Sequence, residues 1–155
     1  MTFDDAFART INHEGGYTEG KDDPGGETKF GLSKRAYPQR NIAALTLADA
    51  RAVYLRDYWG PAGCDAVPDD IKADLFDAAV NSGVRAAVKL LQRAVGEAED
   101  GVLGPRMLQA VNAMSAPRLA ARFNGARPAF MAGLTTWPTF GRGWALRVAD
   151  NLLGV

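Results

Sequence analysis

Apolar residues recur with a helical period along most of the chain. Phe3, Phe7 and Ile11 are spaced four residues apart. Side chains at this spacing share one face of an α-helix, so the stretch predicts an amphipathic helix. Glycine and proline divide the rest of the sequence into further helical stretches. The predicted helices cover residues 2–14, 46–58, 68–81 and 84–95, and three more begin at Pro105, Pro117 and about Gly141.

Polar residues and glycines mark the ends of these helices. Thr2 is typical of a helix N-cap, and residues 46–49 have the spacing of a capping box. The pair Gly15-Gly16 ends the first helix, because glycine readily adopts the left-handed cap conformation. At about 100° per residue, Glu14 points in nearly the same direction as Phe3. A carboxyl group is therefore predicted on the core-facing side of a helix C-terminus.

The helical pattern stops between residues 17 and 32. Residues 23–26 read Asp-Pro-Gly-Gly, which is a strong turn signal. Short stretches around it, such as residues 28–32, have the length to pair as a small hairpin. The sequence shows no internal repeat, no low-complexity stretch and no linker. The predicted fold class is mainly α, in a single domain with a small β-hairpin or loop excursion near residues 17–32.

Length and composition fit one packed domain. The chain has 155 residues, and 47% of them are apolar, which is enough for a core. No apolar run exceeds four residues, so we expect no stable membrane insertion. The N-terminal stretch has neither the basic start nor the apolar middle of a secretory signal, so we expect synthesis in the cytoplasm without a signal peptide.

The overall charge is zero, but the charges are unevenly distributed. Eighteen basic and 18 acidic residues balance, which argues against a nucleic-acid partner. Residues 1–100 hold 12 basic and 17 acidic residues, whereas residues 101–155 hold 6 arginines and 1 acidic residue. One hypothesis is that the C-terminal arginines hold an anionic wall or outer-membrane surface; these are Arg118, Arg122, Arg127, Arg142 and Arg147.

The residue inventory excludes several chemistries. His13-Glu14 begins like the zinc motif H-E-x-x-H, but Tyr17 stands where the second histidine is needed. With one histidine and one cysteine, we predict no metal site, and no cofactor is implied. A catalytic Cys64–His13 pair, of the kind used by many cell-wall amidases and peptidases, is a remaining alternative. The alternative for Cys64, which we favour, is a small buried side chain.

Carboxylate chemistry remains, and two acids have suitable positions for it. Glu14 ends a helix, and Asp23 starts a glycine-rich turn nine residues later. Hydrolysis of a glycosidic bond needs one carboxylic acid to protonate the leaving oxygen and a second carboxylate to stabilise the cation or orient water. Glu19, Asp22 and Glu27 compete with Asp23 for the second role.

The segment around these two acids resembles a known family. Residues 14–17 (EGGY) and 23–32 (DPGGETKFGL) resemble the signature of glycoside hydrolase family 108, the bacterial and phage lysozymes that cut peptidoglycan. The resemblance extends over nearly the whole chain. Further matching stretches are residues 75–83, 90–96, 100–105, 140–144 and 147–148.

The resemblance implies roles for individual residues. Glu14 is the catalytic acid, and Asp23 with Thr28 positions the attacking water. The spacing E-x8-D-x4-T is similar to the E-x8-D-x5-T pattern of small inverting phage lysozymes, but is one residue shorter between the last two positions.

Three further residues are candidates for substrate binding. Tyr17 and Phe30 flank the motif, and Asn81 ends a helix in a stretch that the family shares. Two of them have structural alternatives, because Phe30 also suits the core of a hairpin and Asn81 also suits a helix C-cap.

The resemblance also implies a biological setting. It predicts a single lysozyme-like domain, with the catalytic motif in residues 1–83 and a helical, peptidoglycan-binding-like part in residues 84–155 packed on it. The expected role is a phage or prophage endolysin that cleaves the β-1,4 bond between N-acetylmuramic acid and N-acetylglucosamine. We expect a monomer that leaves the bacterial cytoplasm through a holin pore and acts on peptidoglycan in the periplasm.

Two alternatives share the same substrate. A lytic transglycosylase needs one acid and no positioned water. A non-catalytic module would bind the cell wall through the D-G-V-L-G-P stretch, residues 100–105, without releasing sugar.

Overall fold

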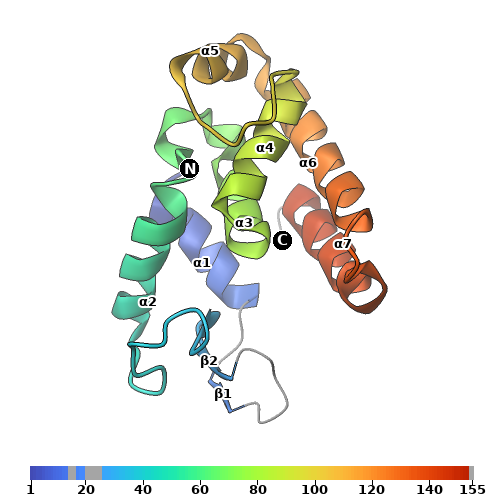
Figure 1. The fold of residues 1–155 in the computed structure, drawn as a ribbon. Helices are drawn as coiled ribbons and strands as arrows, with labels where there is room; N and C mark the ends of the chain where they lie inside the picture. Colours follow the sequence, from blue (N-terminus) through green and yellow to red (C-terminus); the bar gives the residue numbers. More distant parts are fainter. Residues whose placement is uncertain (14–16, 20–25, 154–155) are drawn as a thin grey trace. The chain divides into compact units, whose positions relative to one another are not determined.

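The computed structural model describes residues 1–13, 17–19 and 26–153. Their secondary structure is mainly α-helical with a small antiparallel sheet, which confirms the predicted fold class (Figure 1). Within the described ranges, no helix is long and apolar enough to cross a membrane.

The chain divides into two compact units. One unit comprises Thr2–Asp57, and the other comprises Tyr58–Val155 together with Met1. The single-domain organisation, with its boundary between residues 83 and 84, stays a prediction.

The first unit begins with α1 (Phe3–His13). The Thr2 hydroxyl accepts a hydrogen bond from the Asp5 amide at 3.2 Å, and the Asp5 carboxylate accepts one from the Thr2 amide at 2.9 Å, so the predicted N-cap is confirmed. The ring of Phe3 stacks on that of Phe7 at 5.7 Å between centroids. Phe7 in turn contacts Tyr54 of α2 (Leu47–Tyr54) at 5.6 Å, so aromatic packing joins the two helices.

Helix α2 has the capping box that the sequence predicts. The Thr46 hydroxyl accepts from the Asp49 amide at 3.1 Å, and the Asp49 carboxylate accepts from the Thr46 amide at 2.9 Å. The helix continues into one π-helical turn, η1 (Leu55–Trp59), which agrees with the predicted end near Tyr58.

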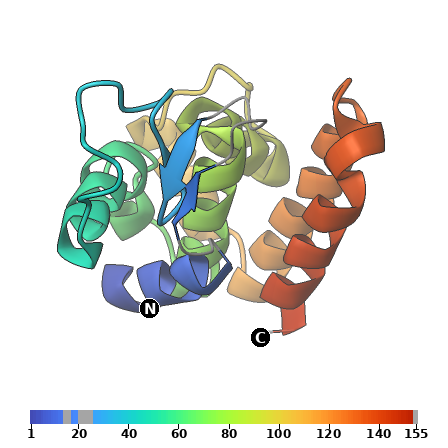
Figure 2. The same ribbon diagram turned by 90° about the horizontal axis from the view of Figure 1, so that it is seen from below.

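The sheet of this unit has three short strands. They are β1 (Thr18–Glu19), β2 (Glu27–Lys29) and β3 (Leu32–Ser33), in the order β1-β2-β3 and antiparallel throughout (Figure 2). In the register, Thr28 lies opposite Thr18 on one side and opposite Ser33 on the other. The predicted hairpin is the β2–β3 pair, and β1 adds a third strand to it.

The second unit is a bundle arranged around α3 (Asp69–Ser82). Helix α3 packs against both α4 and α6, and α6 packs along α7, as Figures 1 and 2 show. The other elements of this unit are η2 (Cys64–Ala66), α4 (Val84–Val95), α5 (Pro105–Ala113), α6 (Ala116–Ala132) and α7 (Trp137–Leu153).

The last helix begins at Trp137, so the predicted start near Gly141 is wrong. Pro138 occupies the first turn of α7, where a missing amide hydrogen costs nothing. Gly141 lies inside the helix, beneath the Trp137 ring. A Cβ atom at position 141 would come within 2.5 Å of that ring, so the close contact requires glycine. The ring of Trp137 also contacts that of Trp144 at 6.3 Å. Glycine here serves close packing and does not mark a helix boundary.

A buried carboxylate connects three helices of this unit. Asp77 of α3 is buried and accepts hydrogen bonds from Arg127 of α6 and from two residues of α7. Arg147 Nε lies 2.7 Å from Asp77 Oδ1, and Asn151 Nδ2 lies 2.8 Å from Asp77 Oδ2. Burial would raise the pKa of Asp77, but the charges of Arg127 and Arg147 outweigh it, so the pKa lies below its ordinary value.

This cluster corrects the hypothesis of a C-terminal arginine surface. Arg127 is fully buried, and Arg147 is bound to Asp77. The Arg122 guanidinium donates to the backbone carbonyl of Ala94. Part of the positive charge of residues 101–155 is therefore used inside the bundle, and Arg118, Arg122 and Arg142 are the exposed members of the five.

The D-G-V-L-G-P stretch is held by a buried amide. Gln92 of α4 is buried, and its Nε2 donates to Asp100 Oδ1 at 2.6 Å and to the Val102 carbonyl at 3.0 Å. Its Oε1 accepts from the Gly101 amide at 2.8 Å. One side chain thus satisfies three groups of the segment between α4 and α5, which gives residues 100–102 a defined conformation.

We expect Asp77→Asn to lower the free energy of unfolding by about 3–5 kcal/mol, because it leaves Arg127 and Arg147 without their buried counter-charge. Chemical denaturation at pH 7 measures the loss. The control is Asp65→Asn, which removes an exposed carboxylate and should leave the stability near that of the unchanged protein.

The loss should depend on pH in a defined direction. The pKa of Asp77 is lowered in the folded state, so its carboxylate stabilises the fold above the unfolded pKa of about 3.9. That contribution disappears as the pH falls through the folded pKa. The stabilities of the unchanged protein and of Asp77→Asn should therefore begin to converge as the pH falls below about 4, and a constant difference down to pH 2 would contradict the assignment.

Candidate active site

Two of the predicted catalytic residues, Glu14 and Asp23, lie outside the described residues. The structure describes only the elements next to them in the sequence. Helix α1 ends at His13, directly before Glu14 in the sequence, and β1 and β2 flank the segment that contains Asp23. Of the other predicted site residues, Tyr17, Thr28 and Phe30 belong to this first unit, and Asn81 belongs to the second.

Thr28 lies at the centre of the small sheet. Residues opposite one another in antiparallel strands point to the same face, so Thr28 shares a face with Thr18 and Ser33. Its hydroxyl donates to the Gly26 carbonyl at 3.3 Å. Because the proton is used in that contact, the Thr28 oxygen is oriented to accept a hydrogen bond from another group.

Glu27 occupies the other face of the same strand. Successive residues of a strand alternate between faces, so the side chains of Glu27 and Thr28 point in opposite directions. The Tyr17 hydroxyl donates to Glu27 Oε1 at 2.9 Å. Glu27 is therefore a partner of Tyr17 and does not share a face with Thr28. This separation weakens Glu27 as the carboxylate that works with Thr28.

Phe30 forms the turn between β2 and β3. Its φ is +51°, and that of Gly31 is +73°, which is the pattern of a two-residue hairpin turn with both central residues left-handed. Glycine adopts this conformation freely, whereas an aromatic residue is strained in it. Phe30 therefore sits at the tip of the hairpin, where it is half-buried.

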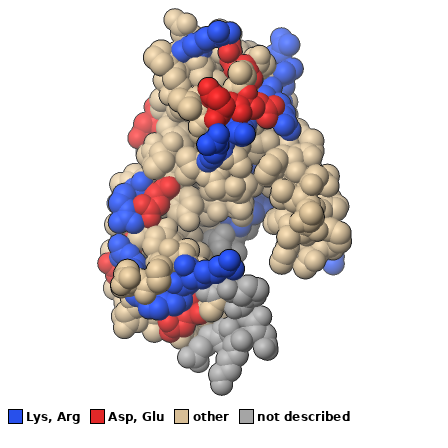
Figure 3. All heavy atoms as spheres, viewed as in Figure 1, with Lys and Arg blue, Asp and Glu red and all other residues tan. Residues whose placement is uncertain are grey.

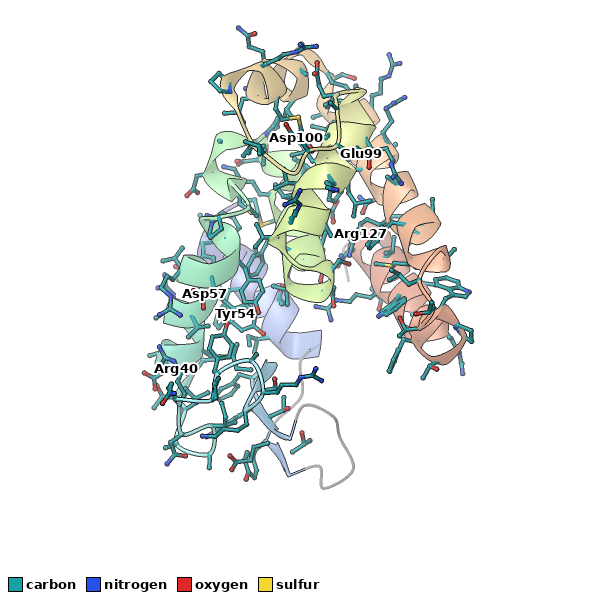
Figure 4. The ribbon with its side chains drawn as sticks, viewed as in Figure 1. Arg40, Tyr54, Asp57, Glu99, Asp100 and Arg127 are labelled. Atoms are coloured by element: carbon teal, nitrogen blue, oxygen red, sulfur yellow. The ribbon has the colours of Figure 1, made fainter. Side chains whose placement is uncertain are left out.

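A buried hydroxyl supports this strained turn. Tyr54 of α2 is buried, and its hydroxyl donates to the Phe30 carbonyl at 3.0 Å (Figure 4). The Lys29 ammonium lies 5.5 Å from the centroid of the Phe30 ring, within cation–π range. Sequence reasoning missed Tyr54, because a tyrosine on the apolar stripe of a helix carries no signal of a contact 24 residues away. Strained residues held in this way are frequent at functional sites.

Asn81 lies in the last turn of α3 and is half-buried. Its Nδ2 donates to the Asp77 carbonyl at 2.8 Å. The helix is closed by Gly83, whose φ is +86° and whose amide donates to the Ala79 carbonyl. Asn81 is thus not the C-cap. Among the residues that the structure describes, no hydrogen bond occupies its amide oxygen, so this oxygen can accept one from a ligand.

Cys64 lacks the properties of a nucleophile. The residue is fully buried, and burial raises the pKa of its thiol to about 12, with a further increase from the charge of Asp65. At neutral pH the side chain is a thiol, and the thiolate is the nucleophilic form. The prediction that Cys64 is a small buried side chain is confirmed. The Cys64–His13 amidase hypothesis is not supported, because Cys64 cannot act as its nucleophile. Among the described residues, no group of three or more acidic, histidine or cysteine side chains has the arrangement to hold a metal ion.

Comparison with known proteins decides the family. A family model described as glycosyl hydrolase 108 matches residues 7–83, and one described as a predicted peptidoglycan domain matches residues 86–149. The solved structure of Brucella abortus SagA is similar over 96% of this chain and 90% of its own, with 36% sequence identity and a TM-score of 0.86. The chain belongs to the glycosyl hydrolase 108 family. No curated protein matches the sequence.

Family membership determines the broad activity. The glycosyl hydrolase match and the peptidoglycan domain together make the protein a lysozyme-like glycoside hydrolase that acts on peptidoglycan. The two models account for residues 7–83 and 86–149, which include every predicted site residue. The resemblance inferred from residues 14–17, 23–32 and 100–105 is confirmed.

The strain at Phe30 is testable by comparing two replacements. Phe30→Asn and Phe30→Ala both remove the ring, but asparagine tolerates the left-handed conformation and alanine does not. We expect the asparagine variant to be more stable than the alanine variant by about 1 kcal/mol. Thermal or chemical unfolding measures the difference. Equal stabilities would show that the backbone at this position relaxes when the ring is removed.

Proposed function

We propose that the protein is an N-acetylmuramidase. It hydrolyses the β-1,4 bond between N-acetylmuramic acid and N-acetylglucosamine, with Glu14 as general acid and with Asp23 and Thr28 positioning the attacking water. The observation that carries the proposal is the match of the glycosyl hydrolase 108 model to residues 7–83, the segment that contains all three residues.

The position of Glu14 suits a general acid. It follows His13, the last residue of α1. The negative end of a helix dipole disfavours a carboxylate and so favours the protonated form. A general acid in a lysozyme must remain protonated near neutral pH, which requires a pKa well above the ordinary value of about 4.3.

The hydrogen bonding of Thr28 suits a water-positioning role. Its hydroxyl proton is directed to the Gly26 carbonyl, so its oxygen accepts one hydrogen of a bound water. A carboxylate at Asp23 would accept the other hydrogen. The lone pair of the water is then free to attack the anomeric carbon from the face opposite the leaving group, which inverts the configuration.

Tyr17, Phe30 and Asn81 are the proposed substrate contacts. The Tyr17 side chain is 43% exposed, and its hydroxyl is anchored on Glu27, so its ring is held in place at the surface. Phe30 is presented at the tip of a strained turn. Asn81 offers an amide oxygen to the N-acetyl groups of the glycan. Aromatic faces and amides together suit a polymer of N-acetylated sugars.

An endolysin role belongs to the same proposal. In that role the protein is made in a bacterial host, is released through a holin pore and acts as a monomer on the cell wall. The family resemblance of the sequence supports it. Delayed lysis of cells that express the protein without a holin, and prompt lysis with one, is the expected behaviour.

Glu14→Gln should lower the release of reducing sugar from purified peptidoglycan by about 10²–10⁴-fold, because the amide has no proton to donate. The variant should keep the unfolding midpoint of the unchanged protein. The matched control is Glu99→Gln, which alters a carboxylate of the helical unit that is paired with Arg93.

Mass spectrometry of the digest separates the alternatives. Reducing N-acetylmuramic acid ends support the proposal, and 1,6-anhydro ends identify a lytic transglycosylase. Binding without any cleavage by the unchanged protein identifies a non-catalytic module. Full activity of Glu14→Gln contradicts the assignment of the acid.

The second carboxylate is tested by a pair of variants. Asp23→Asn should reduce the rate by about 10²–10⁴-fold, since it removes the group that orients water. Glu27→Gln should keep a rate close to that of the unchanged protein, because Glu27 faces away from Thr28 and the glutamine oxygen still accepts the hydrogen bond from the Tyr17 hydroxyl. Rates of reducing-sugar release measure both. If Glu27→Gln lost most of its rate while Asp23→Asn stayed active, Glu27 and not Asp23 would be the carboxylate that positions water.

A further inference from the structure

The segment between α4 and α5 closes a cavity of about 320 Å³. It lies entirely within residues 86–149, the part matched by the peptidoglycan domain model. Six of the residues that line it are Gln92, Glu97, Asp100, Val102, Arg106 and Met107.

The wall of this cavity is held in a defined shape. Gln92 is buried and binds both the Asp100 carboxylate and the backbone of the two residues that follow it, Gly101 and Val102, with contacts of 2.6–3.0 Å. Asp100 Oδ1 also accepts from the Val102 amide at 2.8 Å. Gly96 closes α4 in the left-handed conformation at the other edge. A site whose walls are already ordered pays little conformational entropy when a ligand binds.

Groups of opposite charge line the cavity, and two of them, Glu97 and Arg106, are in direct contact. Glu97 and Asp100 are on the side of α4 and the loop, and Arg106 is in the first turn of α5. Hydrogen bonds from Gln92 and from the Val102 amide hold the pKa of Asp100 below its ordinary value, so it is ionised at neutral pH. Gly104 gives α5 no side-chain cap and Pro105 has no amide hydrogen, so the donors that the first turn offers to an anion are the amides of Arg106 and Met107. Figure 3 shows acidic and basic side chains side by side in this part of the helical unit.

This lining differs from that of a carbohydrate platform. None of the described residues that line the cavity is aromatic. Sugar rings are usually bound on aromatic faces, whereas paired carboxylate and guanidinium groups complement a zwitterion. Peptidoglycan contains both chemistries: its glycan is largely uncharged, and its peptide stems carry carboxylate and ammonium groups.

We propose that this cavity binds the peptide stem of peptidoglycan, with the stem carboxylate on Arg106 and the first turn of α5 and its ammonium on Glu97 and Asp100. The inference rests on the proposed function and extends it, because it makes peptide-bearing glycan the preferred substrate. All the residues that line the cavity belong to the second unit, whereas the proposed catalytic residues belong to the first.

The existing ion pair is compatible with ligand entry. Arg106 Nε lies 3.1 Å from Glu97 Oε2, and the Arg106 side chain is 87% exposed. Exposed ion pairs contribute little to stability. A ligand that brings its own carboxylate and ammonium therefore exchanges one weak pair for two pairs of the same kind.

Calorimetric titration of the full chain tests the proposal with two defined ligands. They are the peptidoglycan disaccharide that carries a tetrapeptide with a free ammonium and the same disaccharide without the peptide. We expect the first to bind and the second to bind much more weakly. Arg106→Gln and Glu97→Gln should each weaken binding of the peptide form by about tenfold, the loss expected for one charge-assisted hydrogen bond. Arg35→Gln, which changes an exposed arginine of the first unit, is the control.

The outcomes distinguish this inference from the proposed function. Unchanged affinity in both cavity variants, or equal binding of the two ligands, overturns the peptide site even if Glu14→Gln is inactive. Conversely, peptide-dependent binding that both cavity variants lose supports the site even if no muramidase products form. Unfolding midpoints verify that the variants fold, which is expected because Arg106 is largely exposed.

Discussion

The helical unit depends on one buried carboxylate. The Asp77 side chain, on α3, is buried away from water. The desolvation free energy of its carboxylate is offset only by close counter-charges and hydrogen bonds. Arg127 of α6, labelled in Figure 4, and Arg147 of α7 contact it from two helices. Only Gly141 and Val148 of α7 are buried, so apolar contact contributes little to holding that helix. The position of α7 is therefore determined mainly by charge pairing, which is directional, and less by hydrophobic contact, which is not.

The first unit relies on a different constraint. Its sheet is too short to be stable alone, with strands of two or three residues. The Tyr54 hydroxyl connects the hairpin tip to α2, and the Tyr54 ring packs on Phe7 of α1. One buried tyrosine thus links the two helices to the turn that presents Phe30. The strain at that turn is a local cost that the surrounding packing sustains.

Local features of the fold were predictable from the sequence, and long-range pairings were not. The capping boxes at Thr2 and Thr46 involve residues three positions apart, so spacing alone reveals them. Asp77 and Arg147 are 70 residues apart, and no local pattern identifies them as partners. For that reason the arginines were expected at the surface. The sequence pattern predicts a helix start near Gly141, because the packing role of this glycine depends on where the Trp137 ring lies, and that position is not encoded locally.

The candidate site shows the same division. Residue identity and spacing indicated Glu14, Asp23 and Thr28, and the family match covers that segment. What spacing did not reveal is the alternation of β2, which places Glu27 and Thr28 on opposite faces. A one-residue difference along a strand reverses a side chain, and strand boundaries this short are not readable from sequence. Whether Glu27 can act together with Thr28 could be judged only once the register of the sheet was known.

The bonding of Gln92 has a consequence for recombining members of this family. The D-G-V-L-G-P stretch looks like a transferable cassette, but its conformation depends on an amide eight residues upstream in another helix. A chimera that exchanges residues 100–105 alone would pair a foreign segment with a resident Gln92, or the reverse. The smallest self-consistent module for exchange therefore extends from α4 through α5, and crossover points belong at Gly83 and after Ala113.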